Sequence, residues 1–323
     1  MSATPEKLLP VQLAHQLPVR TEAQRWLVTG LWLEQSVGLL GGEPKCCKSF
    51  LALDVAVSVA SGTACLRQFP VPSAGRVLLY AAEDALHIVR RRLEGICAAA
   101  QVSFEALDVH VITAPTVRLD LPADRERLES TVQTLKPRLL VLDPFVRLHR
   151  IDENCSGEVA PLLAYLRELQ RRHAISVLVV HHAKKGGARI RAGQALRGSS
   201  EFHAWGDCLL YLRRMESQLT LTVEHRAAPS MPPIDLELAQ RGESLALEIR
   251  AAAQLTPEPP SPTSVDEQII NALSEADHHP LSAAQLRALC SVRKATFYSR
   301  LEDLTRAGRL LRSPEGYRLA TTA

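Results

Sequence analysis

The sequence contains few aromatic residues, and this scarcity limits how a core can be built. Among 323 residues there are three Trp, five Tyr and six Phe, whereas hydrophobic residues make up 46% of the chain. A core of Leu, Val, Ile and Ala suits helices layered on a sheet better than an aromatic-rich β-sandwich. The length corresponds to roughly two domains.

Long apolar runs and paired cysteines are also absent. No run reaches the roughly 18 residues that a membrane-spanning helix needs, and the first residues lack the pattern of a secretory signal. The seven cysteines are odd in number and form no CxxC pair, which argues against a disulfide framework and a structural zinc site. We therefore expect a cytoplasmic protein without membrane contacts.

Neither sign of charge dominates the chain. Its 38 basic and 35 acidic residues leave a formal net charge of +3. This balance excludes a histone-like protein that binds nucleic acid through overall charge. Any nucleic-acid contact must instead come from local basic segments.

Short apolar runs alternate with helical patterns over the first 225 residues, which predicts an α/β fold with a mostly parallel central sheet. The expected strands are 36–40, 77–81, 109–113, 139–143 and 176–180, followed by apolar segments at 207–213 and 219–223. The expected helices are 50–60, 85–99, 124–135 and 157–172.

Proline marks a domain boundary. Four of the eight residues 256–263 are prolines, a composition typical of an extended linker. We therefore predict an N-terminal arm at 1–20, a large α/β domain at 21–255, the linker at 256–263 and a small domain at 264–323.

A phosphate-binding turn is predicted between the strand 36–40 and the helix that follows it. Residues 42–49 match the pattern GxxxxGK[ST] except that Cys47 replaces the second glycine. Backbone N–H groups of such a turn converge on a phosphate, the lysine reaches the outer phosphates, and the serine can ligate Mg²⁺. The expected nucleotide-binding residues are Gly42, Glu43, Pro44, Lys45, Cys46, Cys47, Lys48, Ser49 and Phe50. A side chain at Cys47 would strain a backbone with positive φ.

Polar residues follow three of the predicted strands, where a nucleotide site would need them. Asp143 ends the apolar run 139–143 and is predicted to help Ser49 bind the metal. Glu83 follows the strand 77–81 and is a candidate catalytic base, although a helix-capping role is the simpler alternative. His181 and His182 end the strand 176–180 and should point to opposite faces, so that one of them faces the nucleotide.

These motifs, together with Arg197-Gly-Ser-Ser200, resemble those of the plasmid replicative helicase RepA group over about residues 21–224. The members of this group are RecA-like P-loop ATPases of the AAA type. The resemblance implies a hexamer that hydrolyses ATP with Mg²⁺ between subunits while single-stranded DNA passes through the ring. It also implies the roles of the site residues. The implied catalytic set is Lys48, Glu83, Asp143, His182 and Arg197. Where the family carries an arginine finger, this sequence offers Arg213, Arg214 and Arg226 as alternatives.

Two segments carry local positive charge. The first, residues 184–193, holds Lys184, Lys185, Arg189 and Arg191 among three glycines, which suits contact with a phosphate backbone or is an incidental surface loop. The second lies in the small domain, where predicted helices at 264–276, 282–290 and 294–307 and a hairpin at 310–319 resemble a winged helix-turn-helix. Its candidate duplex-DNA residues are Arg293, Lys294, Tyr298 and Arg300.

The sequence leaves two functions open. The first is a DNA-associated ATP-driven motor, favoured by the joint presence of Glu83, Asp143 and His182. The second is a nucleotide-switched DNA-binding regulator that binds ATP without unwinding DNA, favoured by Cys47. A small-molecule kinase is disfavoured because no lid segment or acceptor site is found.

Overall fold

The protein consists of two compact units, residues 1–251 and 252–323. The computed structural model describes residues 9, 11–182, 201–215, 218–229, 231–241, 244–250, 265–276, 279–290, 294–314 and 316–320. The division between the units lies close to the predicted linker, whose own residues are outside the described ranges.

Within the described residues, the first unit is built on a nine-stranded sheet. The strands from β8 to β5 run parallel, and β9, β10 and β11 continue the sheet antiparallel. The order across the sheet is β11 (Ser244–Ile249), β10 (Ile234–Arg241), β9 (Gln218–His225), β8 (Cys208–Met215), β3 (Val37–Gly42), β7 (Ser176–His182), β6 (Leu139–Asp143), β4 (Val77–Ala81) and β5 (Val109–Val111).

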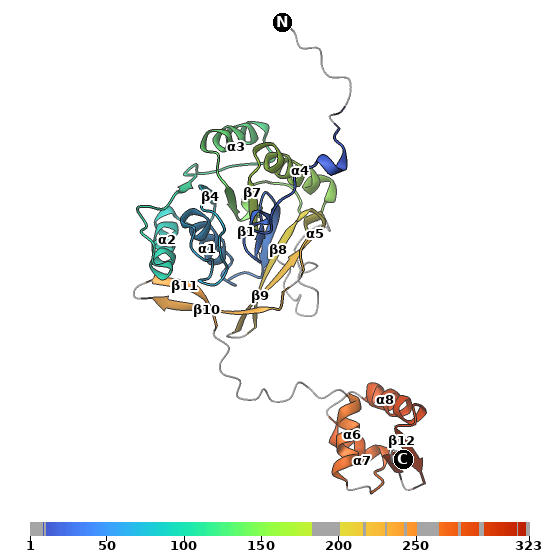
Figure 1. Cartoon of the computed structure of the whole chain (residues 1–323). Coiled ribbons are helices and arrows are strands. Elements are labelled where there is room, and N and C mark those ends of the chain that lie inside the picture. Colours follow the sequence, from blue (N-terminus) through green and yellow to red (C-terminus); the bar gives the residue numbers. More distant parts are fainter. Residues whose placement is uncertain are drawn as a thin grey trace. The chain divides into compact units, whose positions relative to one another are not determined.

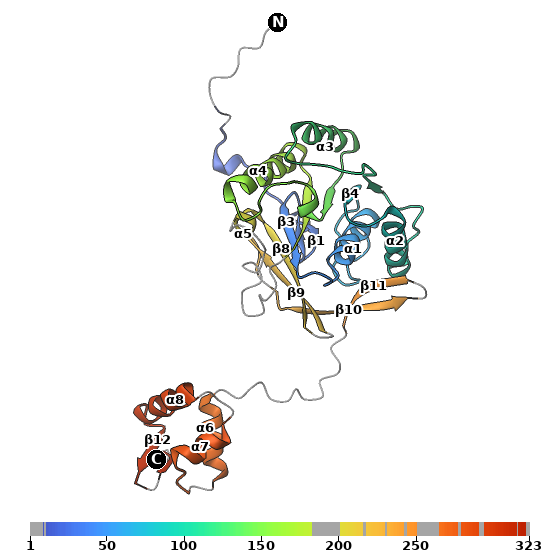
Figure 2. The same ribbon diagram turned by 180° about the vertical axis from the view of Figure 1, so that it is seen from behind.

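Helices cover both faces of this sheet (Figures 1 and 2). On one face lie α1 (Lys48–Ser61) and α2 (Leu86–Ala100); on the other lie α3 (Pro122–Leu135), α4 (Ser156–His173) and the short α5 (Glu201–Trp205). Successive strand residues feed the two cores, since Leu40 belongs to the α1 side and Leu39 to the α3 and α4 side. This double burial explains why the central strands read as continuous apolar runs.

A small hairpin closes the α1 side. Strands β1 (Trp26–Val28) and β2 (Trp32–Leu33) pair antiparallel, and the Trp32 side chain is fully buried in the same core. The hairpin therefore adds aromatic surface to a core that contains few other aromatic residues.

The α/β fold class is confirmed, and each strand and helix predicted in residues 36–182 is present within a few residues. Strands β10 and β11 were not predicted from the sequence. Both lie at the antiparallel end of the sheet, where Leu247 of β11 is buried in the α1 and α2 core.

The second unit has its own small core. It comprises α6 (Val265–Glu275), α7 (Ala283–Leu289), α8 (Lys294–Arg306) and a hairpin of β12 (Leu310–Ser313) and β13 (Gly316–Leu319). Ile269, Leu286 and Phe297 come from the three helices and are fully buried together. The predicted helices and hairpin are present in that order, whereas the winged-helix assignment remains a prediction.

None of the helices in the described part of the chain is long and apolar enough to span a bilayer.

Candidate functional site

The phosphate loop, residues 42–49, leads from the end of β3 to the start of α1. Lys48 is 6% exposed, and its Nζ donates to the carbonyl oxygens of Gly42 at 3.0 Å and Glu43 at 2.8 Å. These carbonyls hold the ammonium inside the loop, next to the free N–H groups at the start of α1. The turn therefore has the charge and the donors that a phosphate group requires.

Cys47 takes the left-handed conformation that the sequence motif reserves for glycine. Its φ is +65°, and the residue caps the N-terminus of α1. A non-glycine residue in this conformation costs roughly 1 kcal/mol, so the loop is locally strained at Cys47. Arg214, near the end of β8, compensates in part, because its guanidinium donates to the Cys47 sulfur at 3.2 Å.

Gly42 is required for steric reasons. A Cβ at this position would lie 2.4 Å from the carbonyl oxygen of Leu212 on the neighbouring β8. Only glycine therefore fits at the position where the chain leaves β3 and enters the loop.

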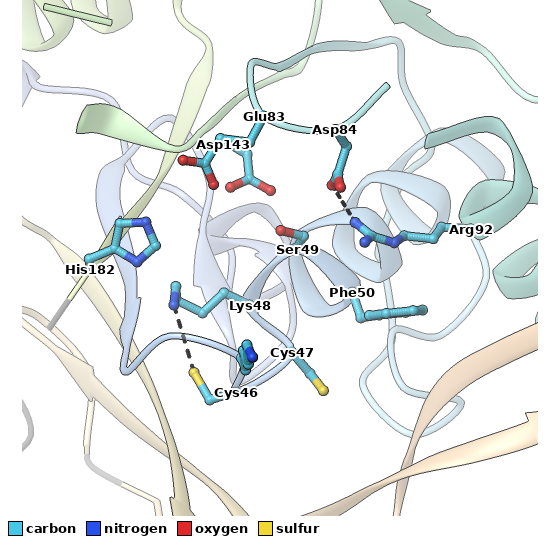
Figure 3. Close-up of a pocket in the computed structure, with 11 residues that line it drawn as sticks. Cys46, Cys47, Lys48, Ser49, Phe50, Glu83, Asp84, Arg92, Asp143 and His182 are labelled. Carbon is cyan, nitrogen blue, oxygen red and sulfur yellow. Dashed lines mark hydrogen bonds and ion pairs between the residues drawn. The ribbon is translucent and has the colours of Figure 1, made fainter. Parts of the chain in front are cut away.

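Asp143 and Glu83 meet at the carboxyl edge of the sheet. Asp143 ends β6 in register with Ala81 at the end of β4, and the backbone N–H of Ala82 donates to its carbonyl at 2.7 Å. This pairing brings the chain after β4, with Glu83 and Asp84, alongside Asp143 (Figure 3).

Burial changes the chemistry of Asp143. Its 9% exposure raises the pKa of the carboxyl from 3.8 to about 6, although a hydrogen bond with Ser49 acts in the opposite direction. A buried carboxylate next to a serine hydroxyl offers the kind of oxygen ligands that Mg²⁺ prefers. Ser49 and Asp143 therefore fit a magnesium ion that also contacts phosphate oxygens.

No three His, Cys, Asp or Glu side chains within the described ranges converge as a self-sufficient metal site. This suits Mg²⁺, which commonly keeps water and substrate phosphates among its ligands and takes only one or two from protein side chains.

Two arginines hold the remaining carboxylates. Arg147, in the short η3 turn (Phe145–Arg147), places its Nε 2.8 Å from Glu83 Oε1. Arg92, on α2, pairs with Asp84 and lies 5.0 Å above the Phe50 ring (Figure 3). Neither arginine was predicted from the sequence, because an ion pair between distant segments leaves no local pattern.

The histidine pair faces opposite sides of the sheet, as predicted. His182 lines the pocket with Lys48, whereas His181 is 1% exposed and stacks on Phe202 of α5 at 4.3 Å. His182 is therefore the histidine placed to meet a nucleotide.

One pocket collects six of the nine predicted nucleotide-binding residues. Its lining residues are Lys45, Cys46, Cys47, Lys48, Ser49, Phe50, Glu83, Asp84, Arg92, Asp143 and His182 (Figure 3). Gly42 and Glu43 contact the pocket through Lys48, and Pro44 belongs to the same turn.

Other predicted residues lie elsewhere. Arg226 pairs with Asp207 at 3.5 Å, and Arg213 lies 5.8 Å from its neighbouring Tyr211 ring. Arg197 and the nucleic-acid candidates Lys184, Lys185, Arg189, Arg191 and Arg293 are outside the described residues.

In the second unit, the candidate DNA-contacting residues of α8 have different surroundings. Lys294 begins the helix, and Tyr298 is 41% exposed. Arg300 pairs with Asp266 of α6 at 2.6 Å, so it links two helices in addition to any role in binding.

Comparison with known proteins places this geometry among P-loop ATPases. Residues 2–188 match the AAA domain family. The crystal structure of the RadB recombinase is similar with a TM-score of 0.49 and 18% identity, covering 68% of this chain and 92% of that one. A KaiC-like protein from Pyrococcus horikoshii OT3 is similar with a TM-score of 0.50 and 15% identity, covering 72% of this chain and 100% of that one.

The likeness to the KaiC-like protein concerns the fold, while the family match covers the phosphate loop, Glu83, Asp143 and His182. Together with the pocket geometry, it identifies the first unit as a RecA-like P-loop ATPase domain that binds nucleotide. Because the family match spans more than half of the sequence, the chain belongs to the AAA domain family.

Proposed function

We propose that the protein is a Mg²⁺-dependent ATPase coupled to DNA, a hexameric motor of the RepA helicase type. The observation that carries this proposal is the convergence of Lys48, Ser49, Glu83, Asp143 and His182 on one pocket. Phosphoryl transfer asks a protein mainly for positioning and for charge stabilisation, and this set supplies both.

Each side chain has a distinct task in the proposed reaction. The phosphate loop binds the β-phosphate, and Lys48 exchanges its carbonyl contacts for β- and γ-phosphate oxygens. Ser49 and Asp143 would hold Mg²⁺, which would supply positive charge next to the phosphates. Glu83 orients the attacking water and accepts its proton as the water oxygen bonds to the γ-phosphorus and ADP leaves. His182 contacts the γ-phosphate from the end of β7.

DNA would be contacted at two places. The basic segment 184–193 follows β7 directly and is the proposed single-strand contact. The second unit, with Lys294 and Tyr298 on α8, is the proposed winged-helix contact with duplex DNA.

A second candidate is supported by Cys47. A strained, thiol-bearing phosphate loop favours a protein that binds ATP and changes state without rapid turnover. In this alternative, nucleotide occupancy controls assembly or DNA binding, and no strand is unwound.

Phosphate release from ATP separates the two candidates. We expect turnover that depends on Mg²⁺, increases several-fold with single-stranded DNA, and disappears in Lys48→Ala because the charge facing the phosphates is lost. Arg171→Ala, which removes an exposed charge from α4, should behave as wild type. Tight ATP binding without turnover, with or without DNA, would reject the motor and favour the switch.

A further inference from the structure

A second group of ionisable side chains lies outside the nucleotide pocket. Glu153, in the loop between η3 and α4, has a side chain that is 15% exposed, and its Oε1 lies 3.3 Å from His149 Nε2 and 4.0 Å from His181 Nδ1. Both histidine side chains are buried. Neither Glu153 nor His149 lines the pocket, so the proposed reaction gives them no task.

The Glu153 carboxyl keeps its charge in spite of burial. Burial raises the pKa of this carboxyl, but the contact with His149 and the nearby His181 outweigh burial, and the pKa lies below its ordinary value. A buried carboxylate is costly, and an apolar side chain of similar volume often stabilises a protein equally well. Packing alone therefore does not account for an acid at this position.

The loop holds the Glu153 carboxylate at a fixed place. The Asp152 carboxylate accepts a hydrogen bond from the backbone N–H of Asn154 at 2.9 Å. The backbone N–H of Asp152 in turn donates to the side chain of Glu158, in the first turn of α4, at 2.9 Å. Glu153 is thus presented to the histidines from a backbone that is anchored to α4.

His181 connects Glu153 to the nucleotide pocket. Its ring stacks on Phe202 at 4.3 Å and has the Glu153 carboxylate near its Nδ1. The next residue, His182, points to the other side of β7 and lines the pocket (Figure 3). In the sheet, His182 is in register with Gly42, where the phosphate loop begins. The contacts that fix His181 therefore also fix the direction in which His182 leaves the strand.

We infer that Glu153 is a positioning residue, which holds His181 on one side of β7 so that His182 on the other side meets the γ-phosphate of ATP. Side chains that are held by buried neighbours keep the geometry that binding needs, and small displacements are expensive. ADP carries no γ-phosphate, so its affinity does not depend on this contact. The inference rests on the proposed function and adds a residue that lets the site distinguish ATP from ADP.

The first test compares two nucleotides and needs no turnover. Glu153→Gln keeps the shape of the side chain but removes its charge. It should weaken the binding of fluorescently labelled AMPPNP, an ATP analogue that is not hydrolysed, several-fold and leave the affinity for labelled ADP unchanged. Glu158→Gln is the matched control, because it removes one negative charge from the same segment and keeps an acceptor for Asp152. Equal losses for the two nucleotides in Glu153→Gln, or no loss for either, overturn the inference.

The second test asks whether Glu153 acts through His182. The AMPPNP affinity of the double variant Glu153→Gln/His182→Ala should equal that of His182→Ala alone, since one contact cannot be lost twice. Losses that add up in the double variant would show that Glu153 acts by another route and would contradict the inference.

Substitutions of His149 test the same route without altering Glu153. In His149→Gln the amide nitrogen takes the place of the imidazole Nε2, so both nucleotides should bind as in wild type. His149→Leu removes the donor and should repeat the selective loss of AMPPNP affinity. A loss in His149→Gln as large as that in His149→Leu speaks against the inference.

The inference and the proposed function fail in different ways. A wild type that binds neither nucleotide in the presence of Mg²⁺ rejects the nucleotide site and the inference together. A wild type that binds both nucleotides, with Glu153→Gln unchanged, rejects the positioning role alone.

Discussion

At the scale of single residues, the nucleotide site contains a buried acidic group whose ionised form destabilises the folded protein. Asp143 is the clearest case, because its carboxyl is buried with a pKa raised from 3.8 to about 6. A group whose pKa is raised on folding stabilises the folded state in its protonated form. That contribution is complete below pH 3.8 and is lost as the pH rises through about 6.

Asp143→Asn should therefore stabilise the nucleotide-free protein above pH 6. The asparagine keeps an oxygen for Ser49 but cannot ionise, so the gain at pH 8 should reach up to about 3 kcal/mol and vanish near pH 4. Urea unfolding at both pH values measures it, and phosphate release should be abolished.

The control has the opposite sign. Burial plays a smaller part at Asp108, where the hydrogen bond from Arg76 lowers the carboxyl pKa. Asp108→Asn should therefore lose stability above pH 4, where wild-type Asp108 is ionised. Two variants that shift in the same direction would show that the burial of Asp143 is not the cause.

At the scale of helices and strands, capping fixes where the second unit starts α7. The Ser282 side chain accepts from the backbone N–H of Gln285, and the Gln285 side chain accepts from the backbone of Ser282. A Ser and a Gln three residues apart in front of an apolar spacing are the sequence pattern of such a capping box.

Ser282→Ala should destabilise the second unit by about 1 kcal/mol, because the backbone N–H of Gln285 loses its acceptor. The three tryptophans, Trp26, Trp32 and Trp205, all lie in the first unit. Calorimetry should therefore show a lower melting temperature for the second unit, while the tryptophan fluorescence transition stays unchanged. A shift in the fluorescence transition would mean that the two units do not unfold independently.

The same scale explains what the sequence could and could not predict. Strands β3, β4, β6 and β7 are buried on both faces, so their apolar runs identify them. β10 alternates apolar and polar residues, as in Ile234-Asp-Leu-Glu-Leu238, which is the pattern of a strand with one covered face, and it was overlooked.

The part of the site that could be predicted consists of residues that directly follow a strand in the sequence. Asp143, Glu83 and His182 were found because each follows the end of an apolar strand. The contacts of Arg92 and Arg147 were not found, because they depend on which strands become neighbours in the sheet.

At the scale of the whole molecule, the chain separates an ATPase unit from a smaller unit with its own core. We expect a chain ending at residue 251 to keep its DNA-free ATP turnover, because each described residue of the pocket lies in the first unit. Its affinity for duplex DNA should fall at least about tenfold, since a second binding module is lost. Fluorescence anisotropy with a labelled duplex measures the change, and an unchanged affinity would remove the second unit from DNA binding.

The two histidines at the end of β7 give the sheet a mechanical property. His182 belongs to the pocket and His181 to the aromatic layer with Phe145 and Phe202, yet one peptide unit separates them. The strand end therefore connects the pocket to the buried aromatic layer through the backbone alone.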